Sequence, residues 1–261
     1  MPSLYSRLLF IVTLVFCLGA DTDTDGRLYA PSADPLADVQ QAINRAEEDD
    51  RLALVVLGAN WCHDSRALAA RLHRSPLAEV IQENYELVFV DVGYLDKGRD
   101  VVQQFDVAHF YATPTMLIID PSNRAVVNDE DRHIWGNAYN IDMSASVRYF
   151  EKWAAHDSAA DPVSDSTQLQ QLYADIAQVE QQLADRVAAG YAVVGPMLVA
   201  YEAGNAPEDF DARWNELRDL RMAIPGDMRK LRDEARQRVS EGEEDIQLEY
   251  PDYPLWSWES E

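Results

Sequence analysis

Cysteine is scarce in this sequence of 261 residues, which contains only Cys17 and Cys62. Cys17 lies in an apolar segment at the start of the chain, so a chain cleaved after that segment keeps Cys62 alone. A single thiol forms no disulfide within its own chain, and in an oxidising compartment it is either an intermolecular partner or a reactive group. The five histidines have no paired ligand spacing, and we expect no metal site and no cofactor.

Positive charge is also scarce, because 22 lysines and arginines stand against 46 aspartates and glutamates, for a formal net charge of -24. A nucleic-acid backbone or an anionic lipid surface would repel such a chain. This excludes nucleic acid as a partner and argues against peripheral membrane binding. The sequence also lacks a phosphate-binding glycine loop. Basic partners and simple solubility remain open.

A bilayer-spanning run is lacking at the start of the chain, because the apolar run at residues 8–18 is shorter than the roughly 20 residues required. Arg7 precedes this run, and the small residues Gly19 and Ala20 follow it. The pattern predicts a signal peptide at residues 1–20, then an acidic segment at 21–33, with no stable membrane span after processing. An uncleaved anchor is the alternative. Arginine outnumbers lysine 19 to 3 and alanine is abundant, which suggests a GC-rich bacterial origin. Together with the signal peptide, this predicts secretion across the inner membrane into a bacterial periplasm.

The most informative feature that is present is the turn around Cys62. An apolar strand pattern at residues 52–57 ends in Gly58, and an Arg/Ala/Leu helix pattern begins at Ser65. Cys62 is therefore expected at or just before the first turn of a helix, where free backbone N–H groups and the helix dipole favour a thiolate over a thiol. The pattern predicts a reactive cysteine, and a small buried core residue is the alternative.

A second feature is Thr113–Pro114, which precedes an apolar strand pattern at residues 115–120. Trp61–Cys62 with Ser65 at a helix start, together with this Thr-Pro pair before a strand, resembles the active-site turn and cis-proline loop of the thioredoxin-like family. The resemblance covers residues 34–155 and implies an α/β fold, a thioredoxin-like mixed sheet flanked by helices. The expected helices cover residues 36–48, 65–74, 98–105 and 144–154, and the expected strands cover 52–57, 87–92, 115–120 and 124–127.

The chain departs from the family pattern at the positions that decide its chemistry. Ser65 stands where the family carries its second cysteine, so Cys62 must act as a single thiol in a CxxS motif. Val56 stands where many thioredoxins carry a buried acid, so that proton relay is missing. The resemblance implies that Cys62 attacks a disulfide sulfur. Ser65, three residues on and on the same helical face, is expected to donate a hydroxyl hydrogen bond to the thiolate, and a polar residue that only starts the helix is the alternative.

The neighbours of Cys62 receive expected roles of their own. His63, if protonated, would stabilise the thiolate, whereas the carboxylate of Asp64 opposes it. An exposed loop histidine is the alternative for His63. In this family the tryptophan before the cysteine packs as a lid, and the Thr-Pro pair forms the wall against which a peptide binds. The expected substrate-binding residues are therefore Trp61, Thr113 and Pro114.

The C-terminal half reads as helical, with a polar linker expected at residues 156–165 and a helical hairpin or bundle at 166–240. Three apolar stripes recur at helical spacing over residues 169–187, 210–224 and 228–239. We expect Gly190, Gly195 and Pro196 to interrupt the first helix, and Pro225 to separate the other two. The stripes are expected to pack on each other or on the first domain. The first stripe, at residues 169–187, could instead form a homo-oligomer or hold a client protein.

The chain ends in an acidic tail at residues 241–261, which contains eight acidic residues, no basic residue and four aromatic ones. Prolines at 251 and 254 predict an extended segment. The aromatic side chains could dock on the protein's own groove or bind another chain, and both remain open.

These observations favour a secreted protein that exchanges disulfides through one thiol, in an isomerase-type or mixed-disulfide reaction. Its expected partners are proteins or low-molecular-weight thiols and disulfides. The alternative is a non-catalytic binding or scaffold protein of the same fold that acts through its C-terminal helices. A hydrolase built on Cys62 and a distant histidine also remains open.

Overall fold

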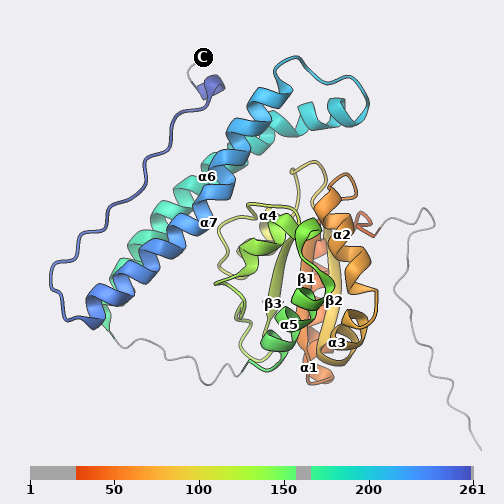
Figure 1. Ribbon diagram of the computed structural model, residues 1–261, viewed down its shortest axis with the longest axis horizontal. Helices are drawn as coiled ribbons and strands as arrows, with labels where there is room; N and C mark the ends of the chain where they lie inside the picture. Colours follow the sequence, from red (N-terminus) through yellow and green to blue (C-terminus); the bar gives the residue numbers. More distant parts are fainter. Residues whose placement is uncertain (1–27, 157–165, 260–261) are drawn as a thin grey trace, which may run out of the picture.

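The computed structural model describes residues 28–156 and 166–259 (Figure 1). The predicted signal peptide and most of the acidic segment after it lie outside the described residues, as does most of the predicted linker. The described chain forms an N-terminal domain built on a sheet and a long hairpin of two helices. Both parts are needed to describe the site.

The sheet has three strands, and the central one carries the site. β1 (Leu52–Gly58) pairs in parallel with β2 (Tyr85–Asp91) and antiparallel with β3 (Thr115–Ile119). The predicted hairpin partner at 124–127 pairs with β3 through one antiparallel bridge, between Val126 and Ile119, and is too short to count as a fourth strand. The next backbone N–H of β3, that of Ile118, donates to the side-chain oxygen of Asn128 at 2.8 Å. This side chain takes the place of the backbone acceptor that a longer strand would supply, so the pairing stops there.

Two layers of helices cover the sheet because side chains of β1 alternate between its faces. Val55 and Leu57 belong to the core under α1 (Pro35–Glu48) and α4 (Arg99–Gln103). Leu54 and Val56 belong to the core under α2 (His63–Leu72), α3 (Leu77–Asn84) and α5 (Met143–Ala154). The mixed sheet flanked by helices is the predicted fold class. The sequence did not predict α3, nor the 3-10 helix η1 (Arg132–Asn140).

The C-terminal helices are longer than predicted. α6 (Thr167–Glu202) runs unbroken through Pro196, and α7 (Phe210–Ser240) runs unbroken through Pro225. The predicted interruptions are therefore wrong. Val194 and Leu198 on either side of Pro196 are 0% and 4% exposed. Their burial offsets the roughly 3 kcal/mol that an interior proline costs.

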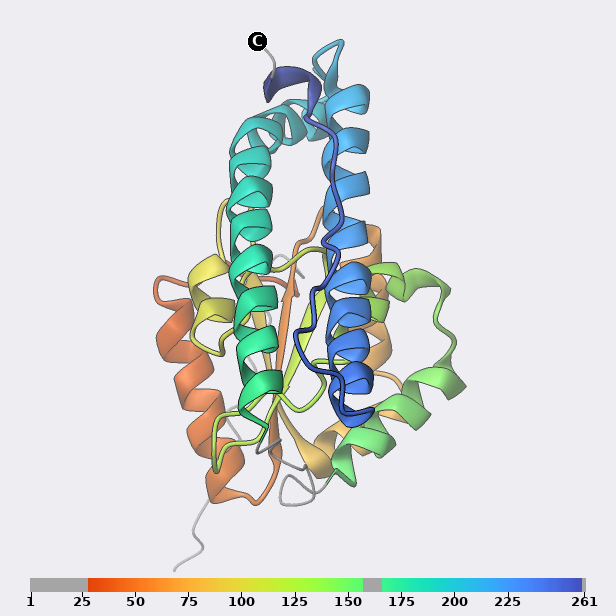
Figure 2. The ribbon, with the colours of Figure 1, turned by 90° about the vertical axis from the view of Figure 1, so that its left-hand side faces the viewer.

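The hairpin packs on the N-terminal domain and shares its core. Val187, Tyr191 and Val194 of α6 belong to the same apolar cluster as Val55 and Leu57 of β1. Figure 2 shows α6 and α7 side by side in front of the sheet. Among the described helices, α6 alone is long and apolar enough to cross a membrane by length and composition. Here its buried side chains serve as core.

The acidic tail is extended, as predicted, and docks on the protein's own hairpin. It runs along α6 and α7 (Figure 2) and ends in a short 3-10 helix, Ser257–Glu259. Trp256 is 3% exposed, its indole N–H donates to the Glu216 carbonyl at 3.2 Å, and the Arg186 guanidinium lies 4.6 Å from its ring centroid. The tail therefore covers the groove between the two helices.

Candidate active site

Cys62 lies where β1 passes into α2. After Gly58 the chain makes a tight turn in which the Cys62 N–H donates to the Ala59 carbonyl at 3.2 Å. Cys62 is then the N-cap of α2 with extended backbone, and its side chain makes no capping hydrogen bond. The sequence predicted this placement. The first-turn N–H groups of α2 are left for a ligand or for a sulfur that ionises.

The Thr-Pro pair lies directly beside the thiol. The Cys62 Sγ donates to the Thr113 carbonyl at 3.1 Å, and the Thr113–Pro114 peptide bond is cis. β3 begins at the next residue, Thr115, whose hydroxyl donates to the Ala112 carbonyl at 2.7 Å. Cys62 is 8% exposed. The structure thus brings the predicted residue Cys62 against the predicted pair Thr113 and Pro114, which begins 51 positions later in the sequence.

Ser65 lies on the first turn of α2, on its inner side. It is fully buried, and its hydroxyl has no hydrogen-bond partner among the described residues, so no bond joins it to the Cys62 sulfur. Gly58 makes room for this hydroxyl, because a Cβ there would lie 2.8 Å from Ser65 Oγ. An unpaired buried hydroxyl three residues after the cysteine is free to donate once a thiolate or mixed disulfide forms.

Tyr29 is a site residue that sequence reasoning missed. It is fully buried, and its hydroxyl donates to the Ser65 carbonyl at 3.1 Å. Burial raises the pKa of Tyr29, and the nearby Cys62 raises it further, so the phenol stays protonated. Tyr29 lies 36 positions before Ser65 in a segment without periodic pattern. Its only signal was an aromatic residue in an acidic stretch.

His63 points away from the interior, and its side chain is 66% exposed. Its Nε2 lies 3.1 Å from a carboxylate oxygen of Asp64. The other Asp64 oxygen accepts the Tyr139 backbone N–H at 2.8 Å, and the Tyr139 ring lies 5.6 Å from the imidazole. Asp64 is only 8% exposed. It ties α2 to η1 and holds the imidazole at the rim of the site.

Trp61 forms the wall on the other side. Its indole N–H donates to the Gly93 carbonyl at 2.7 Å, and its ring stacks on Tyr94 at 6.4 Å. Its other neighbour is Trp214 of α7, edge-on at 6.3 Å. The hairpin therefore reaches the side chain that immediately precedes Cys62.

With this geometry described, comparison with known proteins identifies the first domain. A family model described as thioredoxin-like matches residues 34–121. This part of the chain is a thioredoxin-like domain. A solved structure, that of a disulphide isomerase from Xylella fastidiosa Temecula1, is 24% identical with a TM-score of 0.43, and the match covers 48% of this chain and 95% of that one. No curated protein matches the chain.

The hairpin is also bonded to the loop that leads into Thr113 of the thioredoxin-like domain. Arg221 of α7 donates to the Tyr111 carbonyl at 2.7 Å, and Tyr191 of α6 donates to the Phe110 carbonyl at 3.2 Å. Gly195 of α6 passes so close to Tyr94 that a Cβ would lie 2.6 Å from its carbonyl oxygen. Two long helices thus cover part of the face on which Trp61 lies.

Proposed function

We propose that this protein exchanges disulfides through the single thiol of Cys62. The observation that carries the proposal is the Cys62 sulfur at a helix N-cap, 3.1 Å from the carbonyl of the residue before cis-Pro114. In the reaction the Cys62 thiolate attacks one sulfur of a disulfide and forms a mixed disulfide. The other sulfur leaves as a thiolate and takes up a proton from water.

Release of the product needs a second thiol, which residues 28–156 and 166–259 do not supply. Cys62 is the free cysteine of the described residues, and Ser65 occupies the position from which a resolving thiol would attack. A thiol of the substrate or of a small molecule therefore displaces Cys62. When the thiol belongs to the same substrate, the net reaction is isomerisation, because no electrons are gained or lost.

We place this activity outside the reducing cytoplasm. The predicted signal peptide supports export, and a bacterial periplasm is the compartment that fits the arginine-rich composition. In an oxidising compartment a lone thiol is either an intermolecular partner or a reactive group.

The test is the reactivity of Cys62 in a Cys17→Ser background, where it is the only thiol. We expect iodoacetamide to alkylate Cys62 at about pH 6 faster than it alkylates free cysteine, because helix N–H groups stabilise the thiolate. We also expect mixed disulfides on Cys62 after acid-quenched, non-reducing isolation from cells. Alkylation no faster than that of free cysteine, with no adduct in cells, overturns the proposal.

The covered active-site face favours a second candidate, a binding or scaffold protein that uses the helical hairpin. Cys62 is 8% exposed, and Trp214 packs on Trp61. On this hypothesis a Cys62→Ala variant keeps full function in cells, whereas the exchange hypothesis requires that it lose function.

A further inference from the structure

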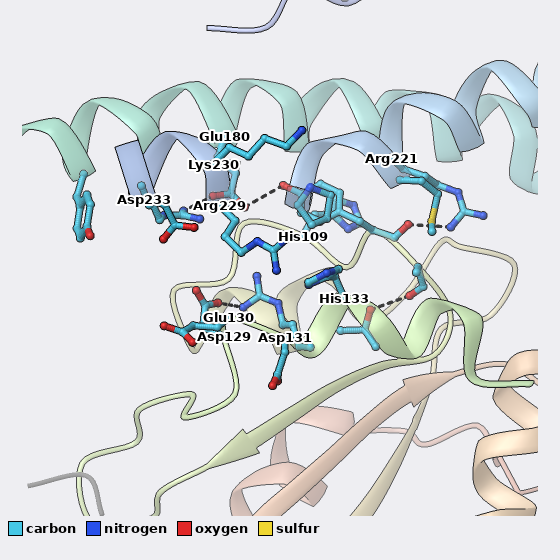
Figure 3. A pocket seen from close by; sticks show the side chains of 18 of the residues that line it. His109, Asp129, Glu130, Asp131, His133, Glu180, Arg221, Arg229, Lys230 and Asp233 are labelled. Atoms are coloured by element: carbon cyan, nitrogen blue, oxygen red, sulfur yellow. Dashed lines mark hydrogen bonds and ion pairs between the residues drawn. The ribbon is translucent and has the colours of Figure 1, made fainter. Parts of the chain in front are cut away.

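A cleft of about 770 Å³ lies between the thioredoxin-like domain and the helical hairpin, where it is lined mainly by α7. One wall is the cis-proline loop with Ala112 and Pro114, a second is the 129–133 segment with His133, and the third is α7 with Met222 and Arg229 (Figure 3). This volume is typical of sites for small molecules. Because Pro114 lines the cleft and Thr113 bonds Cys62, a ligand held here lies beside the reactive loop.

The lining is richer in positive charge than the protein as a whole. Acidic residues outnumber basic ones about two to one in the chain, but six lysines and arginines face five carboxylates here. Four of those carboxylates are already bonded to cations. The pairs are Asp129 with Arg132, Asp131 with Lys152, Glu180 with Arg232, and Asp233 with Arg236. Glu130 is the remaining carboxylate.

Arg229 is the lining cation left without an ion-pair or hydrogen-bond partner among the described residues. Its side chain descends from α7 toward the 129–133 segment, where His133 lies (Figure 3). The pKa of His133 is lowered, first by burial and then by the charge of Arg229. His133 therefore stays neutral near pH 7, and the guanidinium of Arg229 faces the cleft uncompensated.

Two buried polar atoms in the lining also lack partners. Arg221 is 8% exposed and bonds the Tyr111 carbonyl through one terminal nitrogen, but its Nε has no partner in the part of the chain described. His109 is 2% exposed, and its Nδ1 is likewise unpaired. A buried guanidinium N–H is rarely left unsatisfied, so Arg221 points to a ligand that carries acceptor oxygens, and the Nδ1 of a neutral imidazole can either donate to or accept from the same ligand.

We propose that this cleft is a subsite for the carboxylates of a small molecule, with Arg229 and Arg221 as its cationic contacts. Two guanidinium groups suit a ligand with at least two carboxylates. An acidic protein is a poor occupant, because the net charge of -24 repels it at long range. Given the proposed function, the ligand is the anionic part of a small disulfide, whose sulfur Cys62 attacks.

The experiment compares glutathione disulfide with its fully esterified ethyl ester, which has the same skeleton but no free carboxylate. Rates of mixed-disulfide formation at Cys62 are divided by the rates for free cysteine. The field of the acidic protein favours the ester, so a preference for the free acid must come from the cleft. Arg229→Gln should lower the free-acid rate about fivefold and leave the ester rate unchanged. Glu130→Gln should raise the free-acid rate.

Arg218→Gln is the matched control, because Arg218 lies on the same helix, is exposed and pairs only with its neighbour Asp219 among the described residues. It should change neither rate. Equal losses with both disulfides in Arg229→Gln, or no loss with either, overturn the subsite.

Calorimetric titration of the Cys62→Ser variant with citrate separates the subsite from the proposed function, because it needs no thiol. Citrate that binds, and binds about fivefold more weakly after Arg229→Gln, supports the subsite even if Cys62 reacts with neither disulfide. In that case the exchange function is what fails. No citrate binding in the millimolar range, with Cys62 reactive, overturns the subsite alone.

Discussion

At the scale of single residues, the site is an N-cap cysteine whose sulfur bonds a backbone carbonyl, with the His63–Asp64 pair at the rim. The sulfur bonds the Thr113 carbonyl, and Ser65 has a buried hydroxyl with no hydrogen-bond partner among the described residues. Tyr29 closes the inner side by donating to the Ser65 carbonyl. His63 and Asp64 bond to each other at the rim. The backbone of α2, with its unpaired first-turn N–H groups, is therefore the feature that acts on the sulfur most directly.

Restoring a second thiol at Ser65 is a direct test of this arrangement. An N-cap side chain lies next to the residue three positions on, so the thiol of Ser65→Cys should reach Cys62. With excess dithionitrobenzoate, the parent chain in a Cys17→Ser background should release about one thionitrobenzoate and keep the other as an adduct. Ser65→Cys should release about two and carry no adduct, because the second thiol displaces it.

Ser65→Ala is the control, and it should behave as the parent does, with one equivalent released. A Ser65→Cys protein that keeps its adduct, with the new thiol titrating only after unfolding, would show that the two side chains do not face each other.

At the scale of elements, α6 and α7 run unbroken through their internal glycines, and these glycines differ in what packs against them. Gly190 of α6 faces Leu217 of α7 and Trp256 of the tail, and an added Cβ would lie 2.7 Å from each. Gly226 of α7 has nothing within 4 Å of such a Cβ. Two helical glycines of the same hairpin thus have opposite surroundings.

We expect Gly190→Ala to destabilise the protein by about 1–3 kcal/mol, because the methyl group overpacks the groove that holds Trp256. Gly226→Ala should stabilise it by about 0.5–1 kcal/mol, because alanine loses less entropy in a helix and meets no obstacle. Urea unfolding followed by circular dichroism measures both. Similar effects of the two substitutions would contradict the assigned packing.

The sequence predicted those elements that have a strong local pattern. The strands at Leu52–Gly58 and Thr115–Ile119 and the mixed sheet are confirmed, because continuous apolar runs signal buried strands. The eight-residue helix Leu77–Asn84 was missed, because it is too short to repeat its apolar pattern. The proline and glycine breaks were wrong, because packing between distant segments outweighed local propensity.

The candidate site divides in the same way. Cys62 and Pro114 were predictable from residues that flank them in sequence, whereas Tyr29 and Arg229 reach the site only through the tertiary fold. No local pattern marks either residue. The sequence did not predict that the hairpin docks on the cis-proline loop. The docking depends on contacts between distant residues, such as the hydrogen bond from Arg221 to the Tyr111 carbonyl, 110 positions apart.

At the scale of the whole molecule, the thioredoxin-like domain and the hairpin meet at an aromatic interface. His109 and Phe110 of the domain pack on Tyr191 of α6, with ring centroids 5.2 Å and 5.5 Å away. Outside this cluster Arg99 pairs with Asp185. Burial, and then the charge of Arg99, lower the pKa of His109 to about 4. The interface therefore holds a neutral histidine.

This histidine should make stability depend on pH. In the unfolded chain its pKa is about 6.5, so between about pH 6.5 and 4 the unfolded state binds a proton that the folded state does not. Stability therefore falls as pH falls, with a loss of about 2 kcal/mol from His109 between about pH 7.5 and pH 5. His109→Phe keeps the ring and should remove this part of the loss, measured by urea unfolding at both pH values.

His73→Gln, a change at an exposed histidine, is the control and should leave the loss of stability intact. If His109→Phe retains the full loss of unfolding free energy between the two pH values, the neutral His109 is not the source of the pH dependence.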